Sequence, residues 1–551
     1  MAGLPPFDPS QGAPALTRRA LRAAAQPVFL LTIYWGSKPL RLSSAPVEID
    51  TDDGGRLRFV GGLPEVPHDA TFDLFSESSS MPEVSFQELY LPADVAHLVF
   101  RLGYDPARAT GEYAVWLPGT TWESRLVLVS GRVHDPTFGG ADDPVALSLR
   151  SLPLEDRVPL LPAGWRVTST TWPSAASSAV DKAGPFVWGR PGAYTTAGGA
   201  TGSGPGSPAW MVDTTSSAEK LLAAYHPTQA GQAGSIVQVY ASDGTNDGLN
   251  ASHGADANGV PVTLIDLSSP GALTVDATLD YYIGWSGDDG ALLDGERLVE
   301  GLGDLVVYLG RRSGARLDMA RLRAAAPALN IPSGSYVDDP SVYIWAWITG
   351  NVLPILDAST VHGPQGLYLE PWHLGARLDD VAARFTTGPG FVREGPIQTE
   401  GTRDVVDAVQ LRFAVDVEAG EHKRTKRYGA DRPEAGDSSL LHSRLALLTS
   451  ADPAASTLHS VESDLIYTDG AADRVGLAQA VRRSASRHVL TYRCGVEHAW
   501  VQPGALVALT DDELYLTNRL AVARPRALTA SALLFDFILI PSPLRDVRDV
   551  A

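Results

Sequence analysis

The chain has 551 residues, 44% of them hydrophobic and 20% charged, which is enough for packed cores and indicates about three to four domains. Asp and Glu total 64 against 44 Lys and Arg, and the resulting formal charge of −20 argues against a dedicated nucleic-acid-binding protein. The lone cysteine, Cys494, excludes an intrachain disulfide and a cysteine-rich metal site.

The first 27 residues carry little structural signal. Arg18-Arg19 followed by alanines weakly matches a twin-arginine export signal, but Gln26-Pro27 interrupts the apolar stretch that such a signal needs. The apolar run Val28–Ile33 is far too short to span a membrane. We therefore predict that residues 1–27 form an N-terminal arm that orders on assembly.

Residues 28–161 show short extended segments separated by turns. The turn signal Asp52–Gly55 is followed by a polar and apolar alternation, and the predicted strands are Val28–Tyr34, Arg56–Val60, Glu112–Leu117, Arg125–Val129 and Val145–Leu149. This pattern predicts a β-barrel-like domain.

Residues 162–299 are predicted to be a β-rich middle domain with a Gly/Ser-rich loop, 197–206. The expected strands are Ile236–Tyr240, Val262–Ile265 and Leu279–Trp285, and a polar loop, Ser242–Gly259, is expected between the first two.

Residues 300–389 are predicted to be an α-rich inserted domain. Helices are expected over 303–312 and 317–326, the second of which stops before Pro327. A third is expected to start at Asp338-Asp339-Pro340 and continue to Val352, because an acidic N-cap followed by an early proline is typical of a helix start.

Residues 390–551 are predicted to be a second β-barrel-like domain with one helix. A strand is expected over 405–417, a helix over 471–486 with its apolar stripe at Val475, Ala478, Val481 and Ala485, and later strands at 488–492 and 532–540. The predicted fold is mainly β with α/β insertions, in which two β-barrel-like domains flank mixed middle domains.

The motif search assigns no catalytic, cofactor-binding or metal-binding residue. No lysine follows a glycine as in a phosphate-binding loop, no G-x-S-x-G is present, and the nearest histidines, His488 and His498, are too far apart for a two-histidine helical zinc motif. The glycines of Gly388-Pro389-Gly390 do not form a dinucleotide fingerprint. The loop Asp243–Gly248 partly matches a calcium loop, but Thr245 and Gly254 replace required acids, so a solvated hairpin loop is expected.

Three further groups of residues are candidate chemical sites. The acidic sets Asp288-Asp289, Asp338-Asp339 and Asp511-Asp512-Glu513 are expected to serve turns and caps instead of forming a glycosidase pair. Trp345 and Trp347 favour a helix core over a sugar-stacking or interface platform. The basic run Lys423–Arg427 fits a solvated hairpin tip, with salt bridges to a neighbouring acidic subunit as the functional alternative.

Several stretches together resemble tail hub (baseplate hub) proteins of tailed phages and gene transfer agents. They span roughly residues 165–515, and their order and spacing carry the resemblance: Phe186–Gly192, Pro205–Asp213, Asp304–Leu309, Tyr336–Pro340, Val352–Leu356, Gly363–Tyr368, Ala478–Ser486 and Gln502–Thr510.

This resemblance implies a non-enzymatic homotrimer at the distal end of the tail of a virion made in the bacterial host cytoplasm. Two β-barrels from each of three subunits would form a pseudo-sixfold ring that joins a sixfold tail tube to a threefold spike or fibre. The implied partners are the distal tail or tail tube protein, the tape measure protein, the central spike or fibre protein, DNA in passage during ejection, and a host surface. An acidic lumen would let DNA pass without sticking.

Two alternatives remain open from the sequence. One is a tail-associated cell-wall or capsule hydrolase, which needs two carboxylates facing each other in a cleft. The other is a receptor-binding tail-tip module that uses 242–259 and 197–206 as contact loops.

Overall fold

The structure of the protein is a computed structural model. The described residues are 26–35, 38–64, 83–90, 103, 109–137, 144–151, 158–195, 201–216, 218–233, 236–241, 244–268, 275–285, 292–295, 297–363, 365–372, 377–400, 405–406, 408–429, 457–483, 486–495, 498, 500–528 and 533–540. The twin-arginine pair and most of the predicted arm lie outside them, as does Asp288-Asp289.

The N-terminal strands form one open sheet in the order β3-β4-β2-β1-β6-β7-β8-β5. Its strands are β1 (Val28–Trp35), β2 (Lys38–Ser43), β3 (Val47–Asp50), β4 (Arg56–Gly61), β5 (Glu83–Leu89), β6 (Thr110–Trp116), β7 (Leu126–Thr137) and β8 (Val145–Ser151). Strand β1 is apolar on both faces, with Phe29 and Leu31 in one hydrophobic cluster and Leu30 in another. The continuous apolar run of β1 is explained by its position inside the sheet, because both of its faces are covered by other residues.

Strands between residues 207 and 284 close into a barrel in the order β12-β13-β16-β15-β14-β17. They are β12 (Ser207–Asp213), β13 (Lys220–Ala224), β14 (Ile236–Ala241), β15 (Gly244–Ala255), β16 (Pro261–Asp266) and β17 (Tyr281–Gly284), with the short helix α3 (Gln229–Ala233). Strands β17 and β12 pair at the seam, where the Trp285 indole N–H donates to Ser207 Oγ at 2.8 Å. Just before this barrel, β10 (Ala193–Thr195) pairs with β11 (Thr201–Ser203).

Two predicted loops were wrong. The segment Ser242–Gly259 contains β15, which pairs with β14 on one side and β16 on the other. Its side chains are mostly polar, but Leu249 and Ala251 point into the barrel core, and two inward residues were too weak a signal for a strand. In the Gly/Ser-rich segment 197–206, residues 201–203 form β11.

The centre of the molecule is rich in helices and packs around the two-stranded ladder of β9 (Phe186–Gly189) and β20 (Gly334–Val337). Its other elements are β18 (Leu293–Asp294), β19 (Arg297–Leu298), α4 (Leu302–Arg312), α5 (Met319–Ala325), α6 (Ile344–Trp347), a π-helical turn (Ile348–Val352), a 3-10 turn (Leu353–Ile355), β21 (Ala358–Gly363) and β22 (Gly366–Pro371). The helices predicted at 303–312 and 317–326 are present, the second as the shorter α5.

The helix predicted from Pro340 begins later, at Ile344. Asp339 accepts from the Ser341 N–H at 2.8 Å and forms a local turn there. The backbone of this stretch is engaged by the segment around Leu160, because the Leu160 N–H donates to Val342 O and the Ile344 N–H donates to Val158 O. These tertiary hydrogen bonds delay the helix, although the sequence contains an ordinary start signal.

The C-terminal half contains a second open sheet in the order β23-β30-β31-β32-β29-β24, with β25 also paired to β29. The strands are β23 (Ala383–Thr386), β24 (Phe391–Arg393), β25 (Gln398–Glu400), β29 (Arg487–Cys494), β30 (Leu506–Asp511), β31 (Leu516–Leu528) and β32 (Leu533–Leu539). The fold is thus mainly β with two half-barrel sheets, as predicted.

The segment between β25 and β29 leaves this sheet. It forms β26 (Ala408–Asp416), β27 (Glu421–Gly429), β28 (Leu458–Glu462) and α8 (Asp469–Arg483). Val409, Phe413 and Val475 belong to the same hydrophobic cluster as Leu305 of α4. The range 390–551, predicted as one domain, is therefore divided between the C-terminal sheet and the helical centre. Strand β23 precedes this range, and it joins the C-terminal sheet by pairing with β30.

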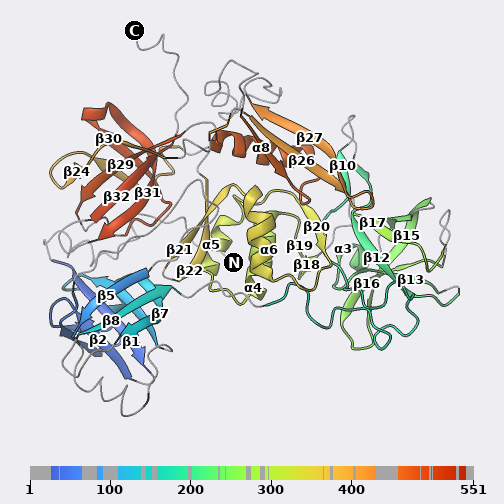
Figure 1. Ribbon diagram of the computed structural model, residues 1–551, viewed down its shortest axis with the longest axis horizontal. Helices are drawn as coiled ribbons and strands as arrows, with labels where there is room; N and C mark the ends of the chain where they lie inside the picture. The colour runs from blue at the N-terminus through green and yellow to red at the C-terminus, as the bar shows by residue number, and fades with distance from the viewer. Residues whose placement is uncertain are drawn as a thin grey trace, which may run out of the picture.

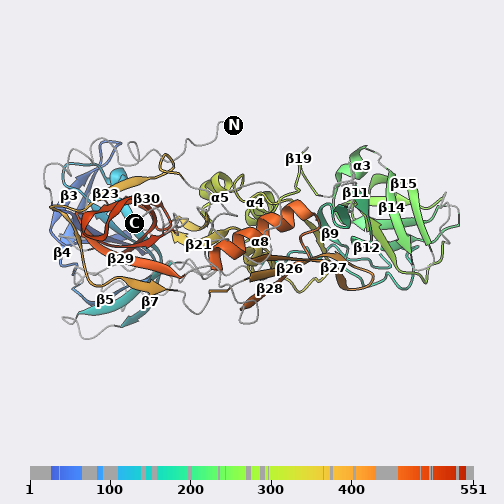
Figure 2. The same ribbon diagram turned by 90° about the horizontal axis from the view of Figure 1, so that it is seen from above.

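The two open sheets lie next to each other at one end of the molecule, the closed barrel lies at the other, and the helices lie between (Figures 1 and 2). Phe29 and Tyr113 of the first sheet and Phe391 and Tyr492 of the second belong to one hydrophobic cluster. Each sheet contains a three-strand antiparallel meander, β6-β7-β8 or β30-β31-β32, but the flanking strands attach in a different order.

Candidate functional site

Both open sheets and the helical centre meet near the hairpin of β21 and β22. The segment Arg316–Asp318 runs alongside β22, with the Leu367 N–H donating to Arg316 O at 3.0 Å and the Asp318 N–H donating to Leu367 O at 2.9 Å. Gly366 makes this approach possible, because its φ is +139° and a Cβ there would stand 2.6 Å from Arg316 O. Gly363 and Gly366 pair at the end of the β21–β22 hairpin, within one of the stretches that carry the resemblance.

The β21–β22 hairpin and the adjoining segment Arg316–Asp318, together the hairpin region, form hydrogen bonds to both open sheets. Arg316 reaches the N-terminal sheet, where its guanidinium donates to Ser130 O at 3.0 Å and to Ser130 Oγ at 3.1 Å. Tyr368 reaches the C-terminal sheet, where its hydroxyl donates to Pro503 O at 3.2 Å. Arg316 and Tyr368 are close in the sequence, yet they contact two sheets whose strands come from opposite ends of the chain.

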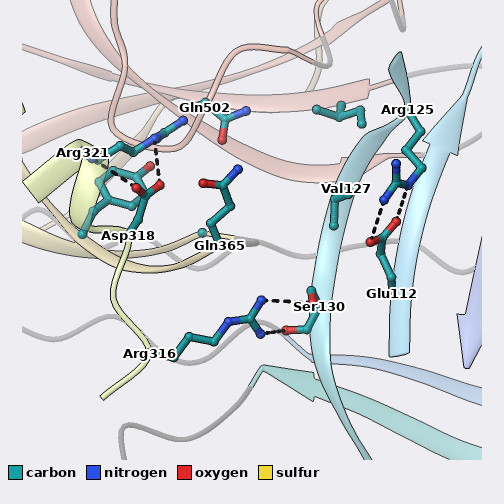
Figure 3. A pocket seen from close by; sticks show the side chains of 12 residues that line it. Glu112, Arg125, Val127, Ser130, Arg316, Asp318, Arg321, Gln365 and Gln502 are labelled. Carbon is teal, nitrogen blue, oxygen red and sulfur yellow. Dashed lines mark hydrogen bonds and ion pairs between the residues drawn. The ribbon is translucent and has the colours of Figure 1, made fainter. Parts of the chain in front are cut away.

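A pocket of about 440 Å³ lies at this junction (Figure 3). Its lining residues come from all three parts: Glu112, Arg125, Leu126, Val127, Ser130, Arg316, Asp318, Arg321, Gly363, Gln365, Tyr368 and Gln502.

Most charges in the pocket are paired. Arg125 forms an ion pair with Glu112, with Nη2 to Oε2 at 3.0 Å, and its guanidinium lies 3.7 Å from the centroid of the Trp122 ring. Arg321 lies 3.5 Å from Asp318 and stacks over the Tyr368 ring at 4.4 Å. The Asp318 carboxylate also accepts the Arg321 N–H at 3.1 Å, which caps helix α5.

Two carboxyl groups near this junction have strongly raised pKa values. Burial raises the pKa of Glu370 to about 7, although Arg321 opposes the shift. Burial likewise raises the pKa of Asp357 to about 7, although Arg474 at 3.5 Å opposes it. Glu370 lies against the Pro503-Gly504 turn, since a Cβ on Gly504 would stand 2.8 Å from Glu370 Cγ. The contact between helical centre and C-terminal sheet therefore contains a group that titrates near neutrality.

We expect Glu370→Gln to remove part of the pH dependence of stability. The pKa of Glu370 is raised in the folded state, so its stabilising effect is complete below pH 4.5 and is lost as the pH rises through about 7. Between pH 4.5 and about 7, the free energy of unfolding of the parent should therefore fall by about 1–3 kcal/mol relative to that of the variant. Urea midpoints measured between pH 4.5 and 8 test this. The exposed Glu462→Gln serves as control, and parallel curves for parent and Glu370→Gln would contradict the expectation.

The acidic sets from the sequence, where described, are engaged locally. The Asp511 carboxylate accepts from the Tyr492 hydroxyl and from the Glu513 N–H, and Glu513 pairs with Arg393 at 2.8 Å. Asp339 serves the turn at Ser341, and its pKa is lowered by those hydrogen bonds. Asp511 thus caps the 3-10 turn Asp512–Leu514, whereas Asp339 forms a local turn and not the helix cap predicted at Asp338-Asp339.

The two candidate tryptophans are core residues. Trp345 and Trp347 are buried, and the Trp347 ring meets Trp188 edge-on at 5.1 Å between centroids. The platform alternative is therefore not supported. Residues 244–248 of the calcium-like loop belong to strand β15, and Asp243 lies outside the described residues.

The basic run Lys423–Arg427 is not a hairpin tip. It is part of strand β27, and acidic residues of the same chain pair with it: Asp416 with Lys423 at 3.2 Å, Asp469 with Arg424 at 2.6 Å and Asp473 with Lys426 at 2.7 Å. Asp469 and Asp473 lie one turn apart on α8, so the run holds this helix on its sheet.

No pocket-lining residue is assigned a role by a sequence motif, although Gly363, Tyr368 and Gln502 lie in stretches that carry the resemblance. A usable signal for the junction was Glu370, an acid that directly follows four buried residues of strand β22. The arginines and glutamines of the pocket carry no motif, and only the fold brings them together. No group of His, Cys, Asp or Glu within the described ranges is arranged to hold a metal ion, and no helix there is long and apolar enough to cross a membrane.

No family model and no curated protein sequence matches this chain. Among solved structures, it is similar to the tail protein from Neisseria meningitidis, with 11% identity and a TM-score of 0.38 over 93% of this chain and 97% of that one. It is also similar to a chain of the virion of a native gene transfer agent particle, with 14% identity and a TM-score of 0.37 over 65% and 85%. A third is a 43 kDa prophage tail protein from Shewanella oneidensis, with 9% identity and a TM-score of 0.34 over 93% and 98%. Two of these structures are described as tail proteins and one as part of a virion.

Proposed function

We propose that the chain is a structural hub at the distal end of a phage or phage-like tail tube. In this proposal it is a homotrimeric, non-enzymatic adaptor of the virion that joins the sixfold tube to a threefold spike or fibre. It lines the channel through which DNA is ejected, and its neighbours are the distal tail or tail tube protein, the tape measure protein and the spike or fibre.

The observation that carries the proposal is the side-by-side placement of the two half-barrel sheets (Figures 1 and 2). They come from opposite ends of the chain, yet their side chains share one hydrophobic cluster and one hairpin region holds both. Three copies of such a pair would present six β-sheets around an axis. Because the two sheets differ in strand order, that ring would be sixfold only approximately, which suits an adaptor between two symmetries.

Electron microscopy of tails that contain the protein, combined with a native mass measurement, tests the proposal. We expect three copies in a ring at the distal end, with its pseudo-sixfold face on the tube. A monomer on the side of the tail would contradict it.

The hydrolase alternative is tested separately by a zymogram on peptidoglycan and a dye-release assay on capsule. We expect no turnover of either polymer. The receptor-binding alternative has to be tested with substitutions at exposed positions. Deletion of 242–259 is not a suitable test, because it would remove strand β15 and open the closed barrel.

A further inference from the structure

The closed barrel is joined to the helical centre along strand β9, which lies between them (Figure 2). Val187 of β9 belongs to the hydrophobic cluster of the barrel, while Phe186 belongs to that of the centre. The chain that leaves barrel strand β13 runs beside β9, where the Tyr225 N–H donates to Pro185 O at 3.0 Å. The next donor of β9 is bound by a side chain, because the Val187 N–H donates to His226 Nε2 at 3.1 Å.

This hydrogen bond fixes the protonation state of His226. A backbone N–H can only donate, so Nε2 accepts it and carries no proton. Nδ1 lies 3.0 Å from Pro227 O, a carbonyl oxygen that can only accept, so the single proton of the ring is on Nδ1. The backbone thus uses both ring nitrogens, and the joint requires a neutral imidazole.

The surroundings of the ring also favour its neutral form. His226 is 5% exposed, and its ring packs against Trp165 and Phe186, with centroids 6.0 Å and 5.4 Å away. The Thr263 hydroxyl of β16 donates to His226 O at 3.0 Å. The guanidinium of Arg312 on α4 lies 5.7 Å and 5.8 Å from the centroids of the same two rings. Burial, with a further contribution from the charge of Arg312, lowers the pKa of His226 to about 4.

Two tyrosines complete the titratable groups around the joint. The Tyr308 ring of α4 stacks on Phe186, with centroids 6.4 Å apart. The Tyr225 hydroxyl donates to Asp256 Oδ2 at 2.6 Å, and burial together with this bond raises the pKa of Tyr225. Asp256 is held at the hydroxyl end of that ring, where it also accepts the Val260 N–H at 2.9 Å.

We propose that His226 is an acid-sensitive switch that holds the closed barrel on the helical centre. Protonation places an N–H on Nε2 opposite the Val187 N–H, so that a hydrogen bond becomes a contact between two donors. The new charge is also buried among apolar rings and is repelled by Arg312. The ring must then leave its site, and the barrel loosens from β9.

A second set of contacts keeps the barrel attached when the switch opens. The Trp285 N–H donates to Pro191 O at 3.1 Å, and the Gly204 N–H donates to Gly192 O at 3.0 Å. These bonds join backbone atoms only, so acid does not change them. The barrel is therefore expected to pivot about Pro191–Gly192 with its own strands still paired. This inference goes beyond the hub function and does not depend on it.

Linkage gives the pH range of the switch. The pKa of His226 is lowered in the closed joint from its ordinary value of 6.5. The contribution of His226 to the joint is therefore complete above pH 6.5 and is lost as the pH falls toward 4. The equilibrium constant for opening should rise by about tenfold or more between pH 7 and pH 5.

Hydrogen exchange of the full-length protein, resolved to single amides by mass spectrometry and corrected for the intrinsic effect of pH on exchange, tests the switch. The Val187 amide should lose protection by about tenfold or more between pH 7 and pH 5, while the amides of β16 keep theirs. His226→Gln should abolish this loss, because its amide oxygen can accept the Val187 N–H and does not titrate. His488→Gln replaces an exposed histidine of β29 and should behave as the parent does.

Arg312→Gln is the second variant, and it keeps the test decisive if His226→Gln does not fold. It removes the positive charge that opposes protonation, so the loss of Val187 protection should shift to higher pH. A shift to lower pH, or none, contradicts the proposal. The proposal also fails if Val187 protection in the parent is the same at both pH values, or if folded His226→Gln loses it as the parent does. Loss of protection in β16 at the same pH would mean that the barrel unfolds, and this too would contradict the switch.

Discussion

Replacing Gly476 by alanine should destabilise the protein by about 3 kcal/mol, the upper part of the range for overpacking a filled core. Gly476 lies on α8, and a Cβ there would stand 2.0 Å from Cε2 and 2.2 Å from Cδ2 of Tyr428. The Tyr428 ring is buried on β27, and its hydroxyl donates to Asp473 Oδ1 at 2.9 Å on the same helix. The ring cannot turn aside without losing that bond, so the helix must lift off its sheet.

Gly470 provides the control on the same helix, since a Cβ there meets nothing within 4 Å. Gly470→Ala should leave stability unchanged or raise it slightly, because alanine has the higher helix propensity. Urea denaturation followed by tryptophan fluorescence measures both variants. If Gly476→Ala and Gly470→Ala unfold at the same midpoint, α8 is not packed against Tyr428 as described.

Asp536→Ala should destabilise the C-terminal sheet by about 3–5 kcal/mol, the cost of removing one partner from a buried ion pair. Asp536 Oδ2 lies 2.8 Å from Arg524 Nη2, and its Oδ1 accepts from the Thr491 hydroxyl at 2.7 Å. The two charged side chains are only 6% and 15% exposed. Glu400 of β25 also pairs with Arg524 at 2.8 Å, which places the expected cost toward the lower end.

The matched control is Asp50→Ala, which breaks the pair with Arg56 on the N-terminal sheet, where both side chains are about two-thirds exposed. Exposed pairs contribute about 0.2–1 kcal/mol, so the control should unfold almost as the parent does. Adding Arg524→Met to Asp536→Ala should recover part of the loss, because the buried charge is then removed. Equal effects of Asp536→Ala and Asp50→Ala on the urea midpoint would contradict the account.

Local pattern was sufficient where an element buries its own apolar residues. The strand predicted from Val28 and the helix predicted over 471–486 are present, the helix as 469–483, with Val475, Ala478 and Val481 buried. Ala485 lies outside the described residues. The core assignment of Trp345 and Trp347 was confirmed for the same reason, because burial of large aromatic side chains dominates their free energy.

Pattern failed where a partner distant in the sequence decides the structure. Strand β15 is mostly polar, and its ladder partners on β14 and β16 make it a strand. The run Lys423–Arg427 has the composition of a solvated tip, yet α8, which lies more than 40 residues later in the chain, supplies the counter-charges of Arg424 and Lys426.

The sequence by itself indicated a mainly β chain with β-barrel-like domains at 28–161 and 390–551 and an α-rich domain at 300–389, because periodicity of apolar residues is a local property of each segment. Only the tertiary structure decided that the segment 408–483 leaves the C-terminal sheet and packs on the helical centre. It alone also decided that Arg316 and Tyr368 form hydrogen bonds to the two open sheets. The physical reason is that ion pairs and hydrogen bonds across domains depend on distances in space, and spacing along the chain does not encode those distances.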